Sequence, residues 1–448
     1  MKTVRSMVLI SGDDESVARG AENIFSSFQK IIQDFGLTDE ISISMVNDIG
    51  RSDISPLVVI YPEAVVYGPV KTEDVHLLVE EHLYKGRIVT EKRAPAHQLS
   101  GHIAWLDARK GTLPAENRIV LKNVGLIDPE DIEDYIAHDG YQALGSVLDI
   151  SAEEVITIIK DSGLRGRGGA GFPTGLKWGF VNKTRNAKKY VVCNADESEP
   201  GTFKDRLVLE GDPHAIIEAM AIAAYVVGAD EGYVYIRGEY GLAIQRMETA
   251  IKQARESGLL GNNILGSSFA FDLHVHAGAG AYICGEETAL IESIEGKRGE
   301  PRSRPPYPTT FGLWGKPTLV NNVETLANIP AIIRNGAQWY RSIGTPSSPG
   351  TKVYTILGNV NVTGLIEVPM GITLREVISI YAKGMKSGTF KLAQTGGSSG
   401  SIVPTDLQDT PMDFDSFSKA GVSLGSGALL ICNEETCVVD LAKVLLNF

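Results

Sequence analysis

The sequence predicts an α/β protein whose largest domain contains a mostly parallel sheet. From residue 190 to residue 276, apolar segments of strand length alternate with two segments of helix length. This βαβαβ order is typical of a parallel sheet with helices on both of its faces. Residues 1–90 show a similar alternation on a smaller scale, whereas residues 350–425 contain short strand-like segments separated by glycine and serine. We therefore expect several structural units in the 448 residues.

The N-terminal unit is expected over residues 1–90. Ile24, Phe28 and Ile32 recur with helical spacing, and the segments on either side are short and apolar. The expected segments are the strands Val4–Ile10 and Ile41–Val46, the helices Ala18–Phe35 and Thr72–Tyr84, and a hairpin of Leu57–Tyr61 with Ala64–Tyr67 that turns at Pro62 and Glu63. A polar linker is expected over residues 91–114.

The central domain is expected over residues 115–345. Ser151 and Glu154 form a capping-box pair at the start of a helix that ends at Gly163. The other expected segments are the strands Tyr190–Asn194, Tyr233–Ile236 and Phe271–His276, and the helices Pro213–Val227 and Leu242–Ser257. The three strands are expected to form the parallel sheet, with the helices between them as connections.

A small mixed β unit is expected over residues 346–425, with the strands Leu365–Val368 and Lys391–Gln394 and the helix Thr373–Ala382. Its order of segments resembles a β-grasp fold. A further helix is expected over Thr436–Leu446, within residues 426–448.

The loop Gly163–Trp178, GLRGRGGAGFPTGLKW, carries the strongest functional signal. Glycine N–H groups can converge on an anion because the backbone approaches it closely, and Arg167 and Lys177 add positive charge. Phe172 and Trp178 offer aromatic faces to a ring. The loop therefore predicts a seat for a phosphorylated cofactor that carries a ring. It contains G-x-G-x-x-G, but a helix and not a strand precedes it, which excludes an ordinary Rossmann fingerprint.

Three more polar clusters follow predicted strands, where ligands bind in open α/β sheets. They are Asn194–Gly201, Gly278–Thr288 and Asn321–Thr325. The second has the spacing of a P-loop, but Glu286 and Glu287 stand where Lys and Ser or Thr would be, so a P-loop is excluded. Capping of a helix N-terminus is an alternative role for these two glutamates.

Two weaker signals have structural alternatives. His274 and His276 could form a metal pair, but no third ligand is nearby in the sequence, so packing along a strand is expected. Gly396–Ser401 could bind an anion, but a turn is the expected structure.

Composition excludes several classes of protein. The net charge of −13 disfavours nucleic acid as a partner. No apolar run has the length of a membrane span, and the N-terminus lacks the long apolar core of a signal peptide. Four dispersed cysteines indicate a reducing compartment. We therefore expect a cytoplasmic protein without direct membrane insertion.

The glycine loop and the clusters at Asn194–Gly201, Tyr282–Thr288, Arg298–Pro308 and Asn321–Thr325 resemble the NADH-oxidising flavoprotein subunit of complex I. The same family occurs in NAD-linked and electron-bifurcating hydrogenases and in NAD-dependent formate dehydrogenases. The resemblance covers about residues 115–448. It implies a central Rossmann-like domain for FMN and NADH, a β-grasp-like domain and the start of a C-terminal helical bundle.

The resemblance implies that FMN and NAD(H) share one cavity. The implied FMN-binding residues are Gly166, Arg167, Gly168, Lys177, Asn194, Asp196, Glu197, Tyr282, Gly285, Glu286, Asn321 and Asn322. The implied NADH-binding residues are Phe172, Phe180, Glu199, Glu287, Arg304 and Tyr307. Many members have Lys and Phe where this chain has Arg304 and Tyr307, which implies an adjusted affinity. No catalytic acid or base is expected, because hydride transfer depends on the positioning of the two rings.

Residues 1–90 resemble the thioredoxin-like [2Fe–2S] domain of the same enzymes. The cysteine positions of that family fall here on Ser11, Ser16, Asp48 and Ser52. Because [2Fe–2S] clusters are held almost always by thiolates, we expect this domain to carry no cluster and to serve in docking. The [4Fe–4S] cluster of the family is also expected to be missing, because its cysteine motif is absent from this sequence, and no metal ligand is assigned.

The resulting functional hypothesis is an FMN-dependent NADH dehydrogenase (diaphorase) subunit that passes single electrons to iron–sulfur partners. The expected partners are a thioredoxin-like [2Fe–2S] subunit and a subunit of a hydrogenase, a formate dehydrogenase or a complex I-type assembly. The fused N-terminal domain favours the soluble hydrogenase and formate dehydrogenase branch, with complex I as the alternative. A catalytically silent scaffold is the alternative of another class. Glu199 and Glu287 are expected to favour NADH over NADPH by repelling a 2′-phosphate.

Overall fold

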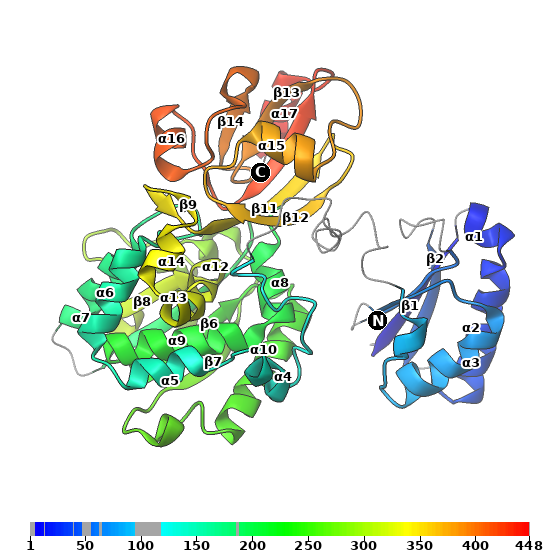
Figure 1. Ribbon diagram of the computed structural model, residues 1–448, viewed down its shortest axis with the longest axis horizontal. Helices are drawn as coiled ribbons and strands as arrows, with labels where there is room; N and C mark the ends of the chain where they lie inside the picture. Colours follow the sequence, from blue (N-terminus) through cyan, green and yellow to red (C-terminus); the bar gives the residue numbers. More distant parts are fainter. Residues whose placement is uncertain are drawn as a thin grey trace. The chain divides into compact units, whose positions relative to one another are not determined.

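The computed structural model describes residues 5–12, 14–38, 40–46, 55–61, 65–94, 118–184 and 188–447. They belong to two compact units, Met1–Ala115 and Glu116–Phe448 (Figure 1). Asp48, Ser52, Pro62 and Glu63 of the sequence-based expectations lie outside the described residues. Among the described residues, no helix is long and apolar enough to cross a membrane.

The first unit contains a four-stranded sheet in the order β2-β1-β3-β4. Its strands are β1 (Ser6–Ser11), β2 (Ile41–Val46), β3 (Val58–Tyr61) and β4 (Val65–Tyr67). Strand β1 runs parallel to β2 and antiparallel to β3, and β3 and β4 are antiparallel. A parallel pair joined through a helix, followed by an antiparallel hairpin, is the thioredoxin-like arrangement, so the predicted fold of this unit is confirmed.

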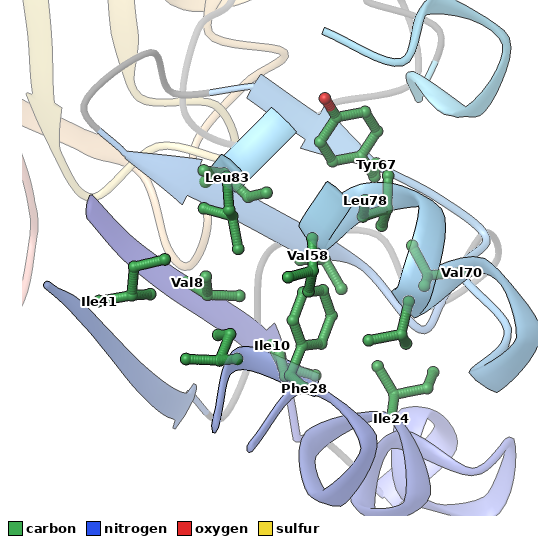
Figure 2. Packing of buried hydrophobic residues seen from close by; sticks show 14 of the residues in the cluster. Val8, Ile10, Ile24, Phe28, Ile41, Val58, Tyr67, Val70, Leu78 and Leu83 are labelled. Carbon is green, nitrogen blue, oxygen red and sulfur yellow. The ribbon is translucent and has the colours of Figure 1, made fainter. Parts of the chain in front are cut away.

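Helices cover this sheet through apolar side chains that recur every third or fourth residue. Figure 2 shows Ile24 and Phe28 of the helix packing toward Val8 and Ile10 of β1, and all four are buried. The single helix expected over residues 18–35 is divided into α1 (Asp14–Ala18) and α2 (Ala21–Asp34). Gly20 separates them in a left-handed conformation, with φ of 97°. The last helix begins with a 3₁₀ turn, Thr72–Asp74, continues as α3 (Val75–Leu77) and ends in a π-helical segment, Leu78–Tyr84.

The second unit contains a fully parallel sheet in the order β7-β6-β5-β8. Its strands are β5 (Tyr190–Ala195), β6 (Glu231–Ile236), β7 (Asp272–Ala277) and β8 (Thr318–Asn322). The predicted parallel sheet is confirmed, and β8 is an additional strand that places Asn321 and Asn322 at its carboxyl end.

Helices surround this sheet (Figure 1). They are α4 (Ile132–Ala137), α5 (Gln142–Leu148), α6 (Ala152–Ser162), α7 (Thr174–Lys183), α8 (Lys204–Gly211), α9 (Pro213–Val227), α10 (Gly241–Glu256), α11 (Glu287–Ile294), α12 (Val323–Ala327), α13 (Ile329–Asn335) and α14 (Ala337–Arg341). Helix α9 is buried over nearly its whole length because it lies between β5 and other helices. Leu290 and Ile291 of α11 pack with Val192 and Val320 of the sheet.

A second, mixed sheet has the order β12-β11-β15-β13-β14. Its strands are β11 (Thr351–Gly358), β12 (Gly364–Pro369), β13 (Phe390–Thr395), β14 (Ser401–Pro404) and β15 (Ala428–Asn433), and two short strands, β9 (Gly344–Thr345) and β10 (Ser348–Pro349), precede it. The accompanying helices are α15 (Leu374–Glu376), which continues as a π-helical turn to Tyr381, α16 (Phe414–Lys419) and α17 (Val438–Asn447).

The expected boundary at residue 425 was wrong. Strand β15 pairs with both β11 and β13 and is therefore the centre of this sheet, not the start of a helical bundle. The following helix begins at Val438, so Cys437 precedes it and does not lie inside it. The two sheets of residues 116–448 also belong to one compact unit.

Candidate functional site

Two adjoining cavities lie at the carboxyl ends of the parallel strands. The smaller has a volume of about 260 Å³ and the larger about 580 Å³. Both are lined by Gly168, Asn194, Gly285, Glu286 and Asn322. Because they share these residues, the cavities form one continuous recess between the glycine loop and the ends of β5 and β8.

The structure brings together nearly all the residues that the sequence nominated. Besides the shared five, the smaller cavity is lined by Asp196, Glu197, Glu199 and Tyr282. The larger is lined by Gly166, Phe172, Lys177, Phe180, Glu287, Asn321, Arg304 and Tyr307. Of the nominated residues, Arg167 and Trp178 do not line either cavity.

The glycine loop follows a helix, as the sequence predicted. Ser151 and Glu154 form the capping box of α6, and Gly163 ends the helix with φ of 71°. The loop then folds back on itself, because Gly166 donates its N–H to the carbonyl of Phe172 at 2.9 Å. At Gly168 a Cβ atom would lie 3.1 Å from Cβ of Asn322, so a side chain here would crowd the floor of the recess.

Arg167 corrects the expectation of a phosphate contact. Its side chain is fully buried. The guanidinium donates to the carbonyls of Arg165, Pro349 and Thr351 at 3.0, 2.7 and 2.9 Å and to the hydroxyl of Tyr340 at 3.1 Å. A buried guanidinium must find acceptors for its fixed set of donors, and backbone carbonyls supply them here. Arg167 therefore joins the glycine loop to the segment that leads into the second sheet.

Trp178 also has a structural role instead of the expected ring contact. It is fully buried, and its indole N–H donates to Oδ1 of Asn321 at 2.9 Å. This bond fixes the orientation of the Asn321 amide, whose NH₂ group is left to donate to a ligand. Trp178 thus positions a residue of the recess without lining it.

Charged side chains of both signs meet at the larger cavity. Nζ of Lys177 lies 2.7 Å from Oε2 of Glu287. Arg304 lies 3.0 Å from Glu286 and 3.3 Å from Glu287. Glu286 is the N-cap of α11 and accepts from the N–H groups of Thr288 and Ala289 at 2.9 and 3.0 Å. Glu286 therefore caps the N-terminus of α11, the alternative role considered for both glutamates, and it lines the recess as well. Glu287 is instead paired with two cations.

Two acids line the smaller cavity, the buried Glu197 and the half-buried Asp196. Burial raises the pKa of Asp196, which accepts a hydrogen bond from the Ser198 hydroxyl. Burial, together with the nearby Asp205, raises the pKa of Glu197 to about 7. The Glu197 carboxylate accepts from the N–H groups of Asp205 and Arg206 at 3.0 Å each, at the first turn of α8. These groups make the rim of the smaller cavity acidic and fix the start of α8.

A buried network of charges beneath the smaller cavity was not predicted. Lys204 lies 2.7 Å from Asp205 and 3.0 Å from Glu324, and Lys352 lies 2.5 Å from Glu324. Burial alone would raise the pKa of Glu324, but Lys352 and Lys204 outweigh it and lower this pKa. Burial lowers the pKa of Lys352 to about 8 despite Glu324. Asp205 also accepts from the amide of Asn322 at 2.6 Å, so the network supports the floor of the recess.

His274 and His276 of β7 pack against tyrosine rings of the neighbouring strand β6. The ring of His276 stacks on Tyr235 with centroids 5.2 Å apart, and the ring of His274 lies 5.5 Å from that of Tyr233. No group of three or more His, Cys, Asp or Glu side chains suited to a metal ion occurs within the described parts of the chain. In the first unit, the Ser16 hydroxyl donates to the Ser11 hydroxyl at 2.9 Å, and Ser11 accepts from the N–H of Leu57 at 2.8 Å.

Comparisons with known proteins match the part of the chain that forms the recess. The family model of the Nuo51 FMN-binding domain (Complex1_51K) matches residues 159–331. The NADP-reducing hydrogenase subunit HndC of Solidesulfovibrio fructosivorans is 55% identical over 332 residues, which span 74% of this chain and 68% of HndC. An NADH-quinone oxidoreductase subunit of Rhizobium meliloti (strain 1021) is 50% identical over 332 residues, which span 74% of this chain and 79% of that protein.

A solved structure extends the similarity to nearly the whole chain. A chain in the crystal structure of an NAD⁺-reducing [NiFe]-hydrogenase in the H₂-reduced state is 29% identical to this one, with a TM-score of 0.63. The similarity covers 98% of this chain and 70% of the hydrogenase chain. The N-terminal unit and both sheets of the second unit are therefore features of a known architecture.

Proposed function

Because this chain belongs to the family of FMN-binding, NADH-oxidising subunits of complex I and of NAD(P)-linked hydrogenases, we propose that it is an FMN-dependent diaphorase subunit. The observation that carries the proposal is the single recess at the carboxyl ends of β5 and β8, which is lined by the nominated glycines, amides and acids. When bound, FMN would supply hydride exchange with a nicotinamide and the release of single electrons.

The residues of the recess fit a flavin mononucleotide. The larger cavity, of about 580 Å³, is within the range of cofactor sites, and the smaller one, of about 260 Å³, adds to it. Gly168 and Gly285 leave the floor open, and the amides of Asn194 and Asn322 can bond to a polar ring edge or to hydroxyl groups. Lys177 supplies a cation for a phosphate or for electron-rich ring atoms. We propose that these residues, with Gly166, Asp196, Glu197, Tyr282, Glu286 and Asn321, hold FMN.

The larger cavity is the proposed entrance for the nicotinamide nucleotide. Phe172 and Phe180 are about half exposed and Tyr307 somewhat more, so flat aromatic faces are accessible to a base. In the proposed complex, Glu287 would accept from ribose hydroxyls and Arg304 would meet a phosphate. With Glu199 in the smaller cavity, these residues form the proposed NAD(H) site. The chain's part in the reaction is to hold two rings in contact and exclude water, without a proton-transferring group.

The proposed partners are iron–sulfur subunits of a multisubunit hydrogenase. Similarity to HndC and to an NAD⁺-reducing [NiFe]-hydrogenase favours this setting, with a complex I-type assembly as the second candidate. We propose that the N-terminal unit, without cluster ligands at Ser11 and Ser16, docks such partners. The proposed organisation is a thioredoxin-like unit, the FMN domain and a mixed β domain that extends through β15.

An anaerobic titration of the purified chain with NADH tests the proposal. The expected result is close to one FMN per chain and bleaching of its visible absorbance by a stoichiometric amount of NADH. A chain that neither contains FMN nor takes it up on addition would contradict the proposal and favour the scaffold alternative. Gly168→Leu is a useful comparison, because the leucine side chain would crowd Asn322 and is expected to prevent FMN binding. A loss of flavin in this variant separates FMN bound in the recess from flavin bound adventitiously elsewhere.

A further inference from the structure

A hairpin of the second sheet holds an acidic side chain at the rim of the smaller cavity. The turn joins β13 to β14 and contains Ser399. The backbone N–H of Ser399 donates to Oε1 of Glu199 at 3.2 Å, and its hydroxyl donates to Oε2 at 3.0 Å. The glycine- and serine-rich turn therefore binds a carboxylate of the protein itself.

Glu199 is held from a second direction by Tyr282. The Tyr282 hydroxyl donates to Oε2 of Glu199 at 2.6 Å and lies 3.3 Å from the Ser399 hydroxyl. Burial, together with this bond to Glu199, raises the pKa of Tyr282, so the hydroxyl remains a donor at neutral pH. Three segments far apart in the sequence thus meet at one carboxylate.

Gly397 shows how closely the turn approaches Glu199. A Cβ atom on Gly397 would lie 2.0 Å from Cγ of Glu199, and its φ of 82° is in the left-handed region. Only glycine allows the turn to close over the carboxylate at this distance. The contact is therefore part of the way the second sheet packs against the recess.

A carboxylate can accept about four hydrogen bonds, and the structure gives three to Glu199 from its neighbours. Because Glu199 also lines the smaller cavity, the remaining acceptor position can meet a donor on a ligand. We propose that Ser399 is a positioning residue for the nicotinamide nucleotide, fixing Glu199 so that it accepts from a hydroxyl or amide group of NAD(H). This inference depends on the proposed function of the recess.

Steady-state kinetics of Ser399→Ala, with NADH and an artificial acceptor, tests the inference. Because the hydroxyl acts through Glu199 on nucleotide binding, KM for NADH is expected to rise about five- to tenfold while kcat stays within about twofold. FMN content is expected to remain that of the wild-type chain. Ser399→Thr keeps both donors and is expected to restore KM.

Ser398→Ala is the matched control, because the bonds that the structure gives to Glu199 come from Ser399 and Tyr282 and not from the Ser398 hydroxyl. In a Glu199→Gln background, Ser399→Ala is expected to have little further effect, since both changes remove the same interaction. The inference would be overturned by an unchanged KM in Ser399→Ala, by an equal rise of KM in Ser398→Ala, or by loss of FMN. It would also be overturned if the effects of Ser399→Ala and Glu199→Gln on KM multiplied fully in the double variant. Failure of the wild-type chain to bind FMN or to oxidise NADH would instead overturn the proposed function.

Discussion

Nζ of Lys177 in α7 lies 2.7 Å from Oε2 of Glu287, the first residue of α11, and this ion pair joins the two helices. Arg304 approaches the same glutamate at 3.3 Å. Two cations therefore face Glu287 at the entrance of the larger cavity. Glu287, which is expected to reject a 2′-phosphate, therefore also balances positive charge of Lys177 and Arg304.

We predict that the wild-type chain prefers NADH to NADPH and that Glu287→Gln weakens this preference. The substitution removes the carboxylate beside Lys177 and leaves Arg304 with Glu286 alone, so a 2′-phosphate would meet more positive charge. The ratio of kcat/KM for NADPH to that for NADH is expected to rise about tenfold or more. Steady-state rates with both nucleotides give this ratio directly.

Glu292→Gln serves as the control for this change. Glu292 lies on the same helix and pairs with Arg302, but it does not line either cavity of the recess. Its nucleotide preference should equal that of the wild-type chain. Equal efficiencies of the wild-type chain with NADH and NADPH would contradict the expected role of the acidic residues.

A second prediction concerns Arg167, whose role is structural. Arg167→Met leaves the carbonyls of Pro349 and Thr351 buried without their donors. Buried acceptors that lose a charged donor cost about 3 kcal/mol or more, which corresponds to a fall in Tm of about 6–12 °C. Thermal unfolding monitored by circular dichroism measures it, and FMN affinity at low temperature is expected to stay within about threefold of the wild-type value.

Arg165→Met is the matched control. Arg165 is partly exposed, pairs with Asp415 at 2.9 Å, donates to the carbonyl of Gly171 at 2.8 Å and lies over the ring of Phe414. Because these groups are less buried, its loss is expected to lower Tm by less than the loss of Arg167. If Arg167→Met released FMN without lowering Tm, the guanidinium would be a ligand of the cofactor after all.

The contrast between Arg167 and Lys177 indicates what could be predicted from the sequence. Strand and helix periodicity, together with the glycine loop and the polar clusters, predicted the parallel sheet and the edge at which the recess lies. Both cationic residues were nominated because each belongs to the glycine loop. Which of them lines the cavity depends on the carbonyls of Pro349 and Thr351, which are about 180 residues away in the sequence.

The same limit applies to the buried network and to the second sheet. Lys204 follows a nominated cluster, but its partner Glu324 and the partner of Glu324, Lys352, come from distant segments. Strand β15 is apolar and short, and only its pairing with β11 and β13 distinguishes it from the start of the next domain. Local patterns thus locate elements, whereas long-range pairing decides which side chains are buried.

A third prediction concerns Asp212, whose pKa is raised to about 7 by burial. Its folded pKa lies above its value in the unfolded chain, so its contribution to stability is fully present below about pH 4 and is lost as the pH rises to about 7. Asp212→Asn should therefore match the wild-type chain near pH 4 and exceed it at pH 8 by up to about 4 kcal/mol. The amide of Asn123 donates to Oδ2 of Asp212 at 2.9 Å, and an asparagine side-chain oxygen can accept the same bond.

Tm of the wild-type chain and of Asp212→Asn, measured at pH 5 and pH 8, tests whether the difference in stability grows with pH. His214, whose pKa burial lowers to about 4, changes stability in the opposite direction but is present in both chains, so it cancels in the difference. Asp230→Asn, at an exposed aspartate that pairs with Lys188, controls for the loss of a surface carboxylate. A difference between wild type and Asp212→Asn that does not grow with pH would contradict the prediction.

The last prediction is that the chain holds FMN but no iron–sulfur cluster. All four cysteines of the sequence, Cys193, Cys284, Cys432 and Cys437, lie in the second unit, so residues 1–115 contain no thiolate ligand. Burial raises the pKa of Cys193 and of Cys432, which disfavours the thiolate form that binds iron.

Anaerobic reconstitution with iron and sulfide, followed by desalting, is expected to leave less than about 0.1 iron per chain, because clusters require several convergent thiolates. A known iron–sulfur protein treated in the same way confirms that the procedure works. Two or four irons per chain, with the matching visible absorbance, would contradict the prediction and give the chain an electron relay of its own.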